Sequence, residues 1–253
     1  MNPLNFNLEG NVFVITGASR GIGLELARAA LSQGSKVVIC ARKAEGLQAA
    51  AADLNAGDDL LAIPAHMAKP EEVENLFEKT MARFGRVDAL INNVGMNLIT
   101  GLVDSDVGVW QKIIDSNLNA TYLCSRKAGQ IMRGQKSGKI VSISSIAAHR
   151  SAPAMGIYGV AKAGIEMMTR VMAHELAPFH IQVNAVAPGM VKTRFSQPFW
   201  SNPEIHEQIV KGIPMGRLAE PMDVVYPTLF LCSEAAGFIT GQTLIVDGGA
   251  SII

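Results

Sequence analysis

The chain has 253 residues, of which 49% are hydrophobic and 17% charged, a composition that allows one large α/β domain. Lys+Arg and Asp+Glu both number 22, so the charge balance does not favour nucleic acid or a membrane surface as a partner. We expect no secretory signal in residues 1–10 and no membrane span, since no apolar run reaches the roughly 18–20 residues required. Cys40, Cys124 and Cys232 lie far apart in apolar segments. They predict buried free thiols in a reducing cytoplasm and no metal site.

Short apolar runs alternate with helical patterns along the chain. The expected strands are 12–15, 36–40, 60–63, 87–91, 139–143, 181–186 and 243–246. The expected helices are 22–31, 44–54, one that begins at 70, 107–132, 157–176 and 221–231. This alternation predicts an α/β fold with a doubly wound parallel sheet of the Rossmann type, about seven strands and helices on both faces. We expect a single domain over 1–253 with an irregular stretch at 190–218, and ligands at the carboxyl ends of the strands.

A glycine-rich turn, TGASRGIG at residues 16–23, separates the first expected strand from the first helix. Its glycines allow a sharp turn, and the N–H groups at the helix start can face an anion such as a phosphate. The spacing Gly-x-x-x-Gly-x-Gly resembles that of the classical short-chain dehydrogenase/reductase family. By this resemblance, the turn residues expected to contact a dinucleotide are Gly17, Ser19, Arg20, Gly21, Ile22 and Gly23.

The end of the second strand indicates which nicotinamide cofactor is preferred. A carboxylate there would bind the ribose hydroxyls of NAD, but no acid occurs between Gly34 and Glu45. Arg42 instead follows the strand, and Arg20 in the glycine turn can reach the same group. Two arginines that can fork onto a 2′-phosphate favour NADP(H) over NAD(H). The alternative is that Arg42 and Lys43 are solvated residues at a helix start.

Lys162 follows Tyr158 at a spacing of four on an expected helix, so both side chains lie on one face. A free phenol has a pKa of about 10 and is a poor base at neutral pH. A neighbouring ammonium would stabilise the phenolate by an amount on the order of 4 kcal/mol. We therefore expect the pKa of Tyr158 to be lowered, so that this residue can exchange a proton with a carbonyl or alcohol oxygen.

The family resemblance implies two further catalytic residues. Ser145 ends the fifth strand about a dozen residues before Tyr158 and would hydrogen-bond the substrate oxygen. Ser144 is the alternative, and Ser142 is expected to be structural. Asn117, in the expected helix 107–132, would hold a water that relays protons to Lys162. The catalytic set implied is thus Asn117, Ser145, Tyr158 and Lys162.

Other elements of the family follow in order. Asn92-Asn93-Val94-Gly95 comes after the fourth strand, Pro188-Gly189 after the sixth, and Asp247-Gly248-Gly249 near the end. The resemblance implies further cofactor contacts from Met67 through its backbone N–H, and from Asn93, Gly95, Tyr158, Lys162, Pro188, Gly189, Val191 and Thr193. His66 stands where relatives usually carry Asp. It either replaces that acid or is an ordinary loop histidine.

Residues 190–218 are expected to form a lid over the substrate. Their aromatic residues favour an apolar substrate, or they pack the lid onto the domain. The expected substrate contacts are Ser145 and Tyr158 with Met96, Met155, Phe195 and Phe199. His149 and Arg150 either meet an acidic group on the substrate or are exposed on the surface.

These features predict an NADP(H)-dependent oxidoreductase that interconverts a ketone and a secondary alcohol. One alternative is a reductase of 3-oxoacyl thioesters carried by acyl carrier protein or CoA, although no convincing basic cluster is evident. Another, of a different class, is a non-catalytic dinucleotide sensor. Such proteins tend to lose the tyrosine or lysine, and both are present here. The family resemblance also implies a homotetramer.

Overall fold

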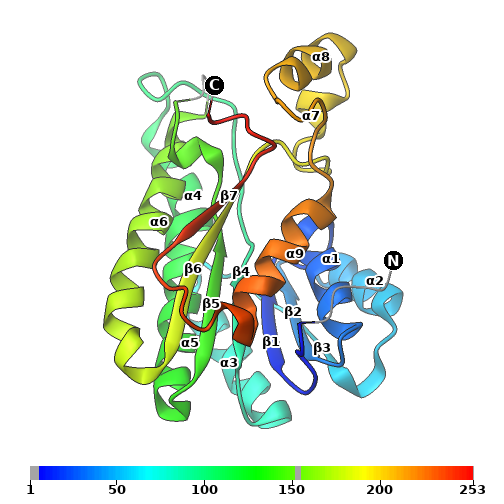
Figure 1. The fold of residues 1–253 in the computed structure, drawn as a ribbon, viewed down its shortest axis with the longest axis vertical. Helices are drawn as coiled ribbons and strands as arrows, with labels where there is room; N and C mark the ends of the chain where they lie inside the picture. Colours follow the sequence, from blue (N-terminus) through cyan, green and yellow to red (C-terminus); the bar gives the residue numbers. More distant parts are fainter. Residues whose placement is uncertain (1–5, 152–154, 253) are drawn as a thin grey trace.

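The computed structural model describes residues 6–151 and 155–252, and among them one seven-stranded sheet forms the centre of the molecule (Figure 1). All pairings are parallel, in the order β3-β2-β1-β4-β5-β6-β7. The strands are β1 (Val12–Thr16), β2 (Lys36–Ala41), β3 (Leu60–Pro64), β4 (Ala89–Asn92), β5 (Gly138–Ile143), β6 (Ile181–Pro188) and β7 (Thr243–Val246). The expected Rossmann-type sheet is confirmed. Its strand order reverses between β1 and β4, which is where such sheets bind ligands.

Alternate side chains of the strands build two separate cores. Phe13 and Ile15 of β1 pack on one face with α1 (Gly21–Leu31), α2 (Ala44–Leu54) and α9 (Pro221–Cys232). Val14 points to the other face, against α3 (Pro70–Phe84), α5 (Ala120–Gln135) and α6 (Gly156–Leu176). Burial on both faces explains why the strands are continuous apolar runs. Figure 1 shows α1, α2 and α9 gathered on one side and α5 and α6 on the other.

The expected helix 107–132 is interrupted in the structure. It divides into α4 (Val107–Ile114), a π-helical turn (Asp115–Asn119) and α5. Asn117 lies in this turn and is fully buried. A π turn inserts one residue into the helical repeat and is frequent at functional sites. A regular helix would carry the side chain of Asn117 to a different position, so the interruption determines where this polar group lies.

The expected irregular stretch at 190–218 contains two short helices, α7 (Gln197–Trp200) and α8 (Pro203–Lys211). The side chain of Asn202 caps α8 by accepting from the backbone N–H groups of Glu204 and Ile205, and Pro203 occupies the first turn. Both helices stand out from the sheet at its carboxyl edge (Figure 1). No helix of the described residues is both long enough and apolar enough to cross a bilayer.

Candidate active site

The glycine turn lies at the switch point between β1 and β4. Gly17 and Gly21 adopt φ values of 67° and 58°, which glycine tolerates best. A Cβ on Gly23 would lie 2.5 Å from the side-chain nitrogen of Asn93, so α1 packs onto the turn only with glycine there. A Cβ on Gly17 would press on Val94 at 3.2 Å. These glycines leave a shallow backbone cradle before the first turn of α1, which fits the phosphates of a dinucleotide.

Asn93 braces this cradle from β4. Its side-chain amide donates to the carbonyl oxygens of Thr16 and Gly17, both at 3.1 Å. Its backbone N–H donates to the hydroxyl of Thr16 at 3.0 Å. The side chain expected to contact the cofactor is thus committed to the turn, because both of its N–H bonds go to backbone carbonyls. Asn92 similarly joins β4 to α5 and β5 through Ser125 and Ser142.

Free positive charge gathers beside the cradle. Arg20 is the N-cap of α1 and Lys43 the N-cap of α2, and neither caps its helix through a side-chain hydrogen bond. In the part of the chain that the structure describes, the side chains of Arg20, Arg42 and Lys43 have no hydrogen-bond or ion-pair partner, and the three residues are exposed. The N–H of Ala18 donates to the carbonyl of Cys40 at 3.1 Å, which brings the turn and the end of β2 together.

The segment after β3 keeps a free backbone donor. Within the described residues, the N–H of Met67 has no partner, while its sulfur packs against the thiols of Cys40 and Cys124 at 3.6 and 3.4 Å. His66 accepts from the N–H of Ala68 through Nδ1 at 3.2 Å. The imidazole therefore forms a local turn of the kind that a carboxylate side chain can also form.

Tyr158 and Lys162 meet on the buried face of α6. The ammonium of Lys162 lies 5.3 Å from the centre of the Tyr158 ring, and the two residues are 8% and 3% exposed. Lys162 donates to the carbonyl oxygen of Ile143 at 2.8 Å. This bond fixes the ammonium at the end of β5, next to the phenol.

The pKa values of this pair differ from the sequence expectation. Burial raises the pKa of Tyr158 to about 12, while a hydrogen bond with Ser145 acts in the opposite direction. Burial lowers the pKa of Lys162 to about 8. The expectation that the ammonium would lower the pKa of Tyr158 is therefore wrong for the chain alone, because the removal of water from the phenol is the largest effect and outweighs the hydrogen bond with Ser145. At neutral pH Tyr158 holds its proton, and so can donate it.

The two serines at the end of β5 serve different purposes. Ser145 hydrogen-bonds Tyr158, and its oxygen also accepts from the N–H of Ala147 at 3.2 Å. Ser144 is buried and donates to a carboxylate oxygen of Glu166 at 2.7 Å. Of the two candidates, Ser145 faces the phenol and Ser144 points into the fold.

Asn117 carries an unsatisfied acceptor close to this pair. Its side-chain nitrogen donates to the carbonyls of Met96 and Ile113, both at 2.8 Å. Its side-chain oxygen is buried without a partner among the described residues. A Cβ placed on Gly95 would lie 3.0 Å from this oxygen and 3.5 Å from the ammonium of Lys162. An unpaired buried acceptor beside a donor is a site that a water can bridge.

The expected substrate residues differ in how close they lie to Tyr158. The rings of Phe195 and Tyr158 are 6.4 Å apart, and Met155 and Leu98 pack on the cluster that contains Tyr158. Met96 contributes its carbonyl to Asn117. No contact joins Phe199 to Tyr158 among the described side chains.

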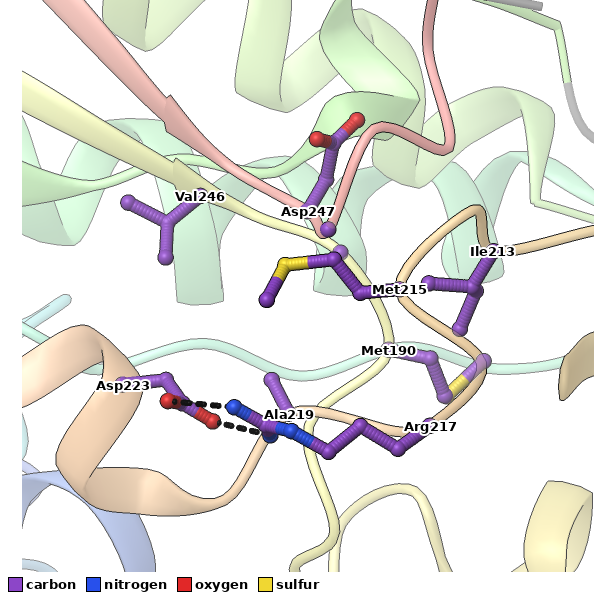
Figure 2. A pocket seen from close by; sticks show the side chains of 10 residues that line it. Met190, Ile213, Met215, Arg217, Ala219, Asp223, Val246 and Asp247 are labelled. Carbon is purple, nitrogen blue, oxygen red and sulfur yellow. Dashed lines mark hydrogen bonds and ion pairs between the residues drawn. The ribbon is translucent and has the colours of Figure 1, made fainter.

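Both ends of segment 190–218 are fastened at its base. Val191 bridges Ala219, and the N–H of Lys192 donates to the carbonyl of Ala219 at 2.8 Å. Arg217 forms two bonds with Asp223 of α9, at 2.6 and 2.9 Å. This pair lines a cavity of about 130 Å³ together with other residues of the segment. Figure 2 shows the pair at this cavity, with the carboxylate of Asp247 turned away from the pair.

From this base the segment reaches back to the cradle. A Cβ on Gly21 would lie 3.7 Å from the methyl group of Thr193, so Thr193 lies over the glycine turn. The indole of Trp200 donates to the carbonyl of Thr193 at 3.1 Å and packs within the segment. Gly189 approaches Asp247, whose Cα would be 3.0 Å from an added Cβ, and follows Pro188 at the end of β6.

His149 and Arg150 are exposed at the surface, as one of the two expectations had it, and each also contacts another part of the fold. His149 meets a carboxylate oxygen of Glu166 through Nε2 at 3.0 Å, and Arg150 donates to the carbonyl of Ala250 at 2.6 Å. Glu166 was not singled out from the sequence. Its spacing of four from Lys162 was the available signal, because it puts a carboxylate on the buried face of the same helix.

Comparison with known proteins identifies the family. The family model described as "Enoyl-(Acyl carrier protein) reductase" matches residues 17–251. The 3-oxoacyl-[acyl-carrier-protein] reductase of Synechocystis is 38% identical over 96% of this chain and 97% of its own length. Dehydrogenase/reductase SDR family member 4 of Sus scrofa is 35% identical over 96% and 88%.

Solved structures of similar proteins point to the same family. A putative gluconate dehydrogenase from Agrobacterium tumefaciens superimposes with a TM-score of 0.94 at 31% identity, covering 99% of this chain and 100% of that one. A short-chain type dehydrogenase/reductase from Mycobacterium marinum gives a TM-score of 0.93 at 30% identity over 98% of both chains. The chain belongs to the short-chain dehydrogenase/reductase family of oxidoreductases.

Proposed function

We propose that this chain is an NADP(H)-dependent oxidoreductase that moves a hydride between nicotinamide and a ketone or secondary alcohol, with Tyr158 as the acid–base residue. The observation that carries the proposal is the buried pair of Tyr158 and Lys162, with the half-buried Ser145 beside it, at the same sheet edge as the glycine cradle. Nicotinamide, when bound, supplies or accepts the hydride.

The proton chemistry belongs to the chain itself. Because burial raises the pKa of Tyr158 to about 12, the phenol keeps its proton and can donate it to the oxygen of a carbonyl being reduced. Ser145 would hold that oxygen by a hydrogen bond. Lys162, whose pKa burial lowers to about 8, can pass a proton toward Tyr158, and a water beside the free oxygen of Asn117 could resupply it.

The preference for NADP(H) is supported by the unpaired cations of Arg20 and Arg42 and by the absence of an acid after β2. Steady-state kinetics with NADPH and NADH test it. Arg42→Ala should lower kcat/KM for NADPH about 10- to 100-fold, since charge-assisted hydrogen bonds contribute about 1.5–3 kcal/mol. The same change should leave the NADH value nearly unaltered.

Lys43→Ala is the matched control, because Lys43 is an adjacent free cation that lacks the forked guanidinium. It should have a smaller effect. The cofactor proposal is wrong if the wild type uses NADH with the higher kcat/KM and Arg42→Ala leaves NADPH use unchanged.

For the substrate we propose a ketone or alcohol with an apolar body, and residues 190–218 of this single domain as the lid. Phe195, Met155 and Leu98 near Tyr158 support an apolar wall. Phe199 and Met96 remain proposed contacts for a substrate that reaches further along the lid.

A reductase of 3-oxoacyl thioesters is the second candidate, favoured by the Synechocystis relative of that name. Comparing acetoacetyl thioesters with simple ketones at equal NADPH separates the two. A sensor without turnover would bind NADPH but reduce no carbonyl in a broad panel.

A homotetramer is also proposed. It is supported by exposed apolar residues on α5 and α6, namely Tyr122, Val160, Met167 and Val171, since patches of this kind mark interfaces. Analytical ultracentrifugation tests it. The cytoplasmic location expected from the cysteines stays a prediction.

A further inference from the structure

A buried carboxylate lies one helical turn beyond Lys162. Glu166 of α6 is 4% exposed and is on the same face as Tyr158 and Lys162. Burying a carboxylate is unfavourable unless its oxygens are well bonded. Replacing buried charged groups by apolar ones is often neutral or stabilising, so stability alone does not account for an acid here.

Glu166 holds both ends of one short segment. One of its oxygens accepts from the hydroxyl of Ser144 at 2.7 Å and meets Nε2 of His149 at 3.0 Å. Ser144 directly precedes Ser145, and His149 ends the single turn Ile146–Ala148 that follows it. We call Ser144, His149 and Glu166 the clasp. It brackets Ser145 from both sides and ties it to the helix that carries Tyr158.

The clasp acts together with other contacts that hold the segment around Ser145. The backbone N–H of Ser144 is bonded to the carbonyl of Val186 at 2.7 Å, and Lys162 holds the carbonyl of Ile143. Both of these bonds precede Ser145 in the chain. After Ser145, Ala147 packs on the apolar cluster that contains Tyr158, its carbonyl oxygen lies close to Gly159 of α6, and the contact of His149 with Glu166 adds a polar side-chain link from the single turn to α6. Without that link, the turn can shift and carry the Ser145 hydroxyl away from the phenol.

We propose that Glu166 is a positioning residue, which keeps the hydroxyl of Ser145 against Tyr158 by holding the segment at Ser144 and His149. The inference rests on the proposed function and adds a residue to it. Displacing a group by about 1 Å can slow a reaction on the order of 100-fold. Glu166→Ala should therefore lower kcat for carbonyl reduction at least 10-fold, with the dissociation constant of NADPH unchanged.

Glu166→Gln is the conservative variant, because its amide oxygen can still accept both bonds. It should retain kcat within about 3-fold, since neutral hydrogen bonds are weaker than charged ones but keep the geometry. Glu175→Ala removes an exposed carboxylate from the same helix and should leave kcat unchanged.

A double-mutant cycle separates positioning from general destabilisation. In a Ser145→Ala background there is no hydroxyl left to position, so adding Glu166→Ala should change kcat less than 2-fold. If the two losses multiply instead, or if Glu166→Ala alone keeps wild-type kcat, Glu166 does not position Ser145 and the inference is wrong.

Amide hydrogen exchange tests the clasp without turnover. Glu166→Ala should speed exchange in residues 144–150, while residues 16–23 exchange as in the wild type. Unchanged exchange in 144–150 overturns the inference whether or not the wild type reduces any carbonyl. A wild type that binds NADPH but reduces nothing in the panel overturns the proposed function alone.

Discussion

Replacing Lys162 by methionine should abolish catalysis without weakening the fold. Burial lowers the pKa of Lys162 from 10.5 to about 8. At ~1.4 kcal/mol per pKa unit, burying the ammonium costs on the order of 3 kcal/mol at neutral pH. Methionine has a similar length and no charge, so the variant is relieved of that cost.

The substitution also removes a favourable contact. Lys162 donates to the carbonyl of Ile143 at 2.8 Å, and a hydrogen bond of this charged kind contributes about 1.5–3 kcal/mol. At pH 7, the two effects together should make the free energy of unfolding of Lys162→Met higher than that of the wild type by between about zero and 2 kcal/mol.

The lowered pKa of Lys162 also determines how the stability of the wild type changes with pH. Between the folded pKa of about 8 and the unfolded value of 10.5, the unfolded chain binds more protons than the folded one. Wild-type stability from this group therefore rises with pH across that window, and the advantage of Lys162→Met shrinks. Below pH 8 the advantage is fully present.

Urea unfolding at pH 7.0, 8.5 and 9.5, together with NADPH-dependent turnover, measures both effects. Lys139→Met is the matched control, since Lys139 is also buried but bonds Gln182 at 2.5 Å and pairs with Glu234. It should lose about 1–3 kcal/mol and keep its activity. The reasoning is refuted if Lys162→Met is the less stable variant by more than 2 kcal/mol at pH 7, or if its advantage grows from pH 8 upward.

Two glycine substitutions test the site further. Gly23→Ala puts a methyl group 2.5 Å from the side-chain nitrogen of Asn93, so it should cost about 1–3 kcal/mol of stability and weaken NADPH binding at least 10-fold in a fluorescence titration. If Gly23→Ala binds NADPH as tightly as the wild type, the glycine turn is not the phosphate cradle. Gly95→Ala puts its methyl group 3.0 Å from the oxygen of Asn117 and 3.5 Å from the ammonium of Lys162. It should lower kcat several-fold and change the free energy of unfolding by less than about 0.5 kcal/mol. An unaltered kcat would argue against a proton relay through a water between Asn117 and Lys162.

Features set by neighbouring residues could be predicted from the sequence. The strands are apolar runs buried on both faces, and the glycine turn joins a strand to a helix within eight residues, so both are visible locally. Tyr158 and Lys162 share a helix, and their spacing alone puts them on one face. Cys40, Cys124 and Cys232 are free and buried, as their apolar surroundings indicated.

Features set by distant contacts could not be predicted. The raised pKa of Tyr158 depends on how completely other elements exclude water from it. The π turn at Asn117 changes hydrogen bonding within a helix whose apolar pattern hardly changes. Glu166 acquires its role from Ser144 and His149, which are 22 and 17 positions earlier in the chain and meet it only in the folded protein.

The central claim is that the phenol of Tyr158 supplies the proton for carbonyl reduction. The direct test is single-turnover reduction of a ketone by Tyr158→Phe preloaded with NADPH, after circular dichroism and a binding titration have shown that the variant folds and holds cofactor. We predict that NADPH binds as in the wild type while its oxidation slows by a factor on the order of 100 or more. Full-rate oxidation of NADPH by this variant would contradict the account, because the proton would then have to come from another group.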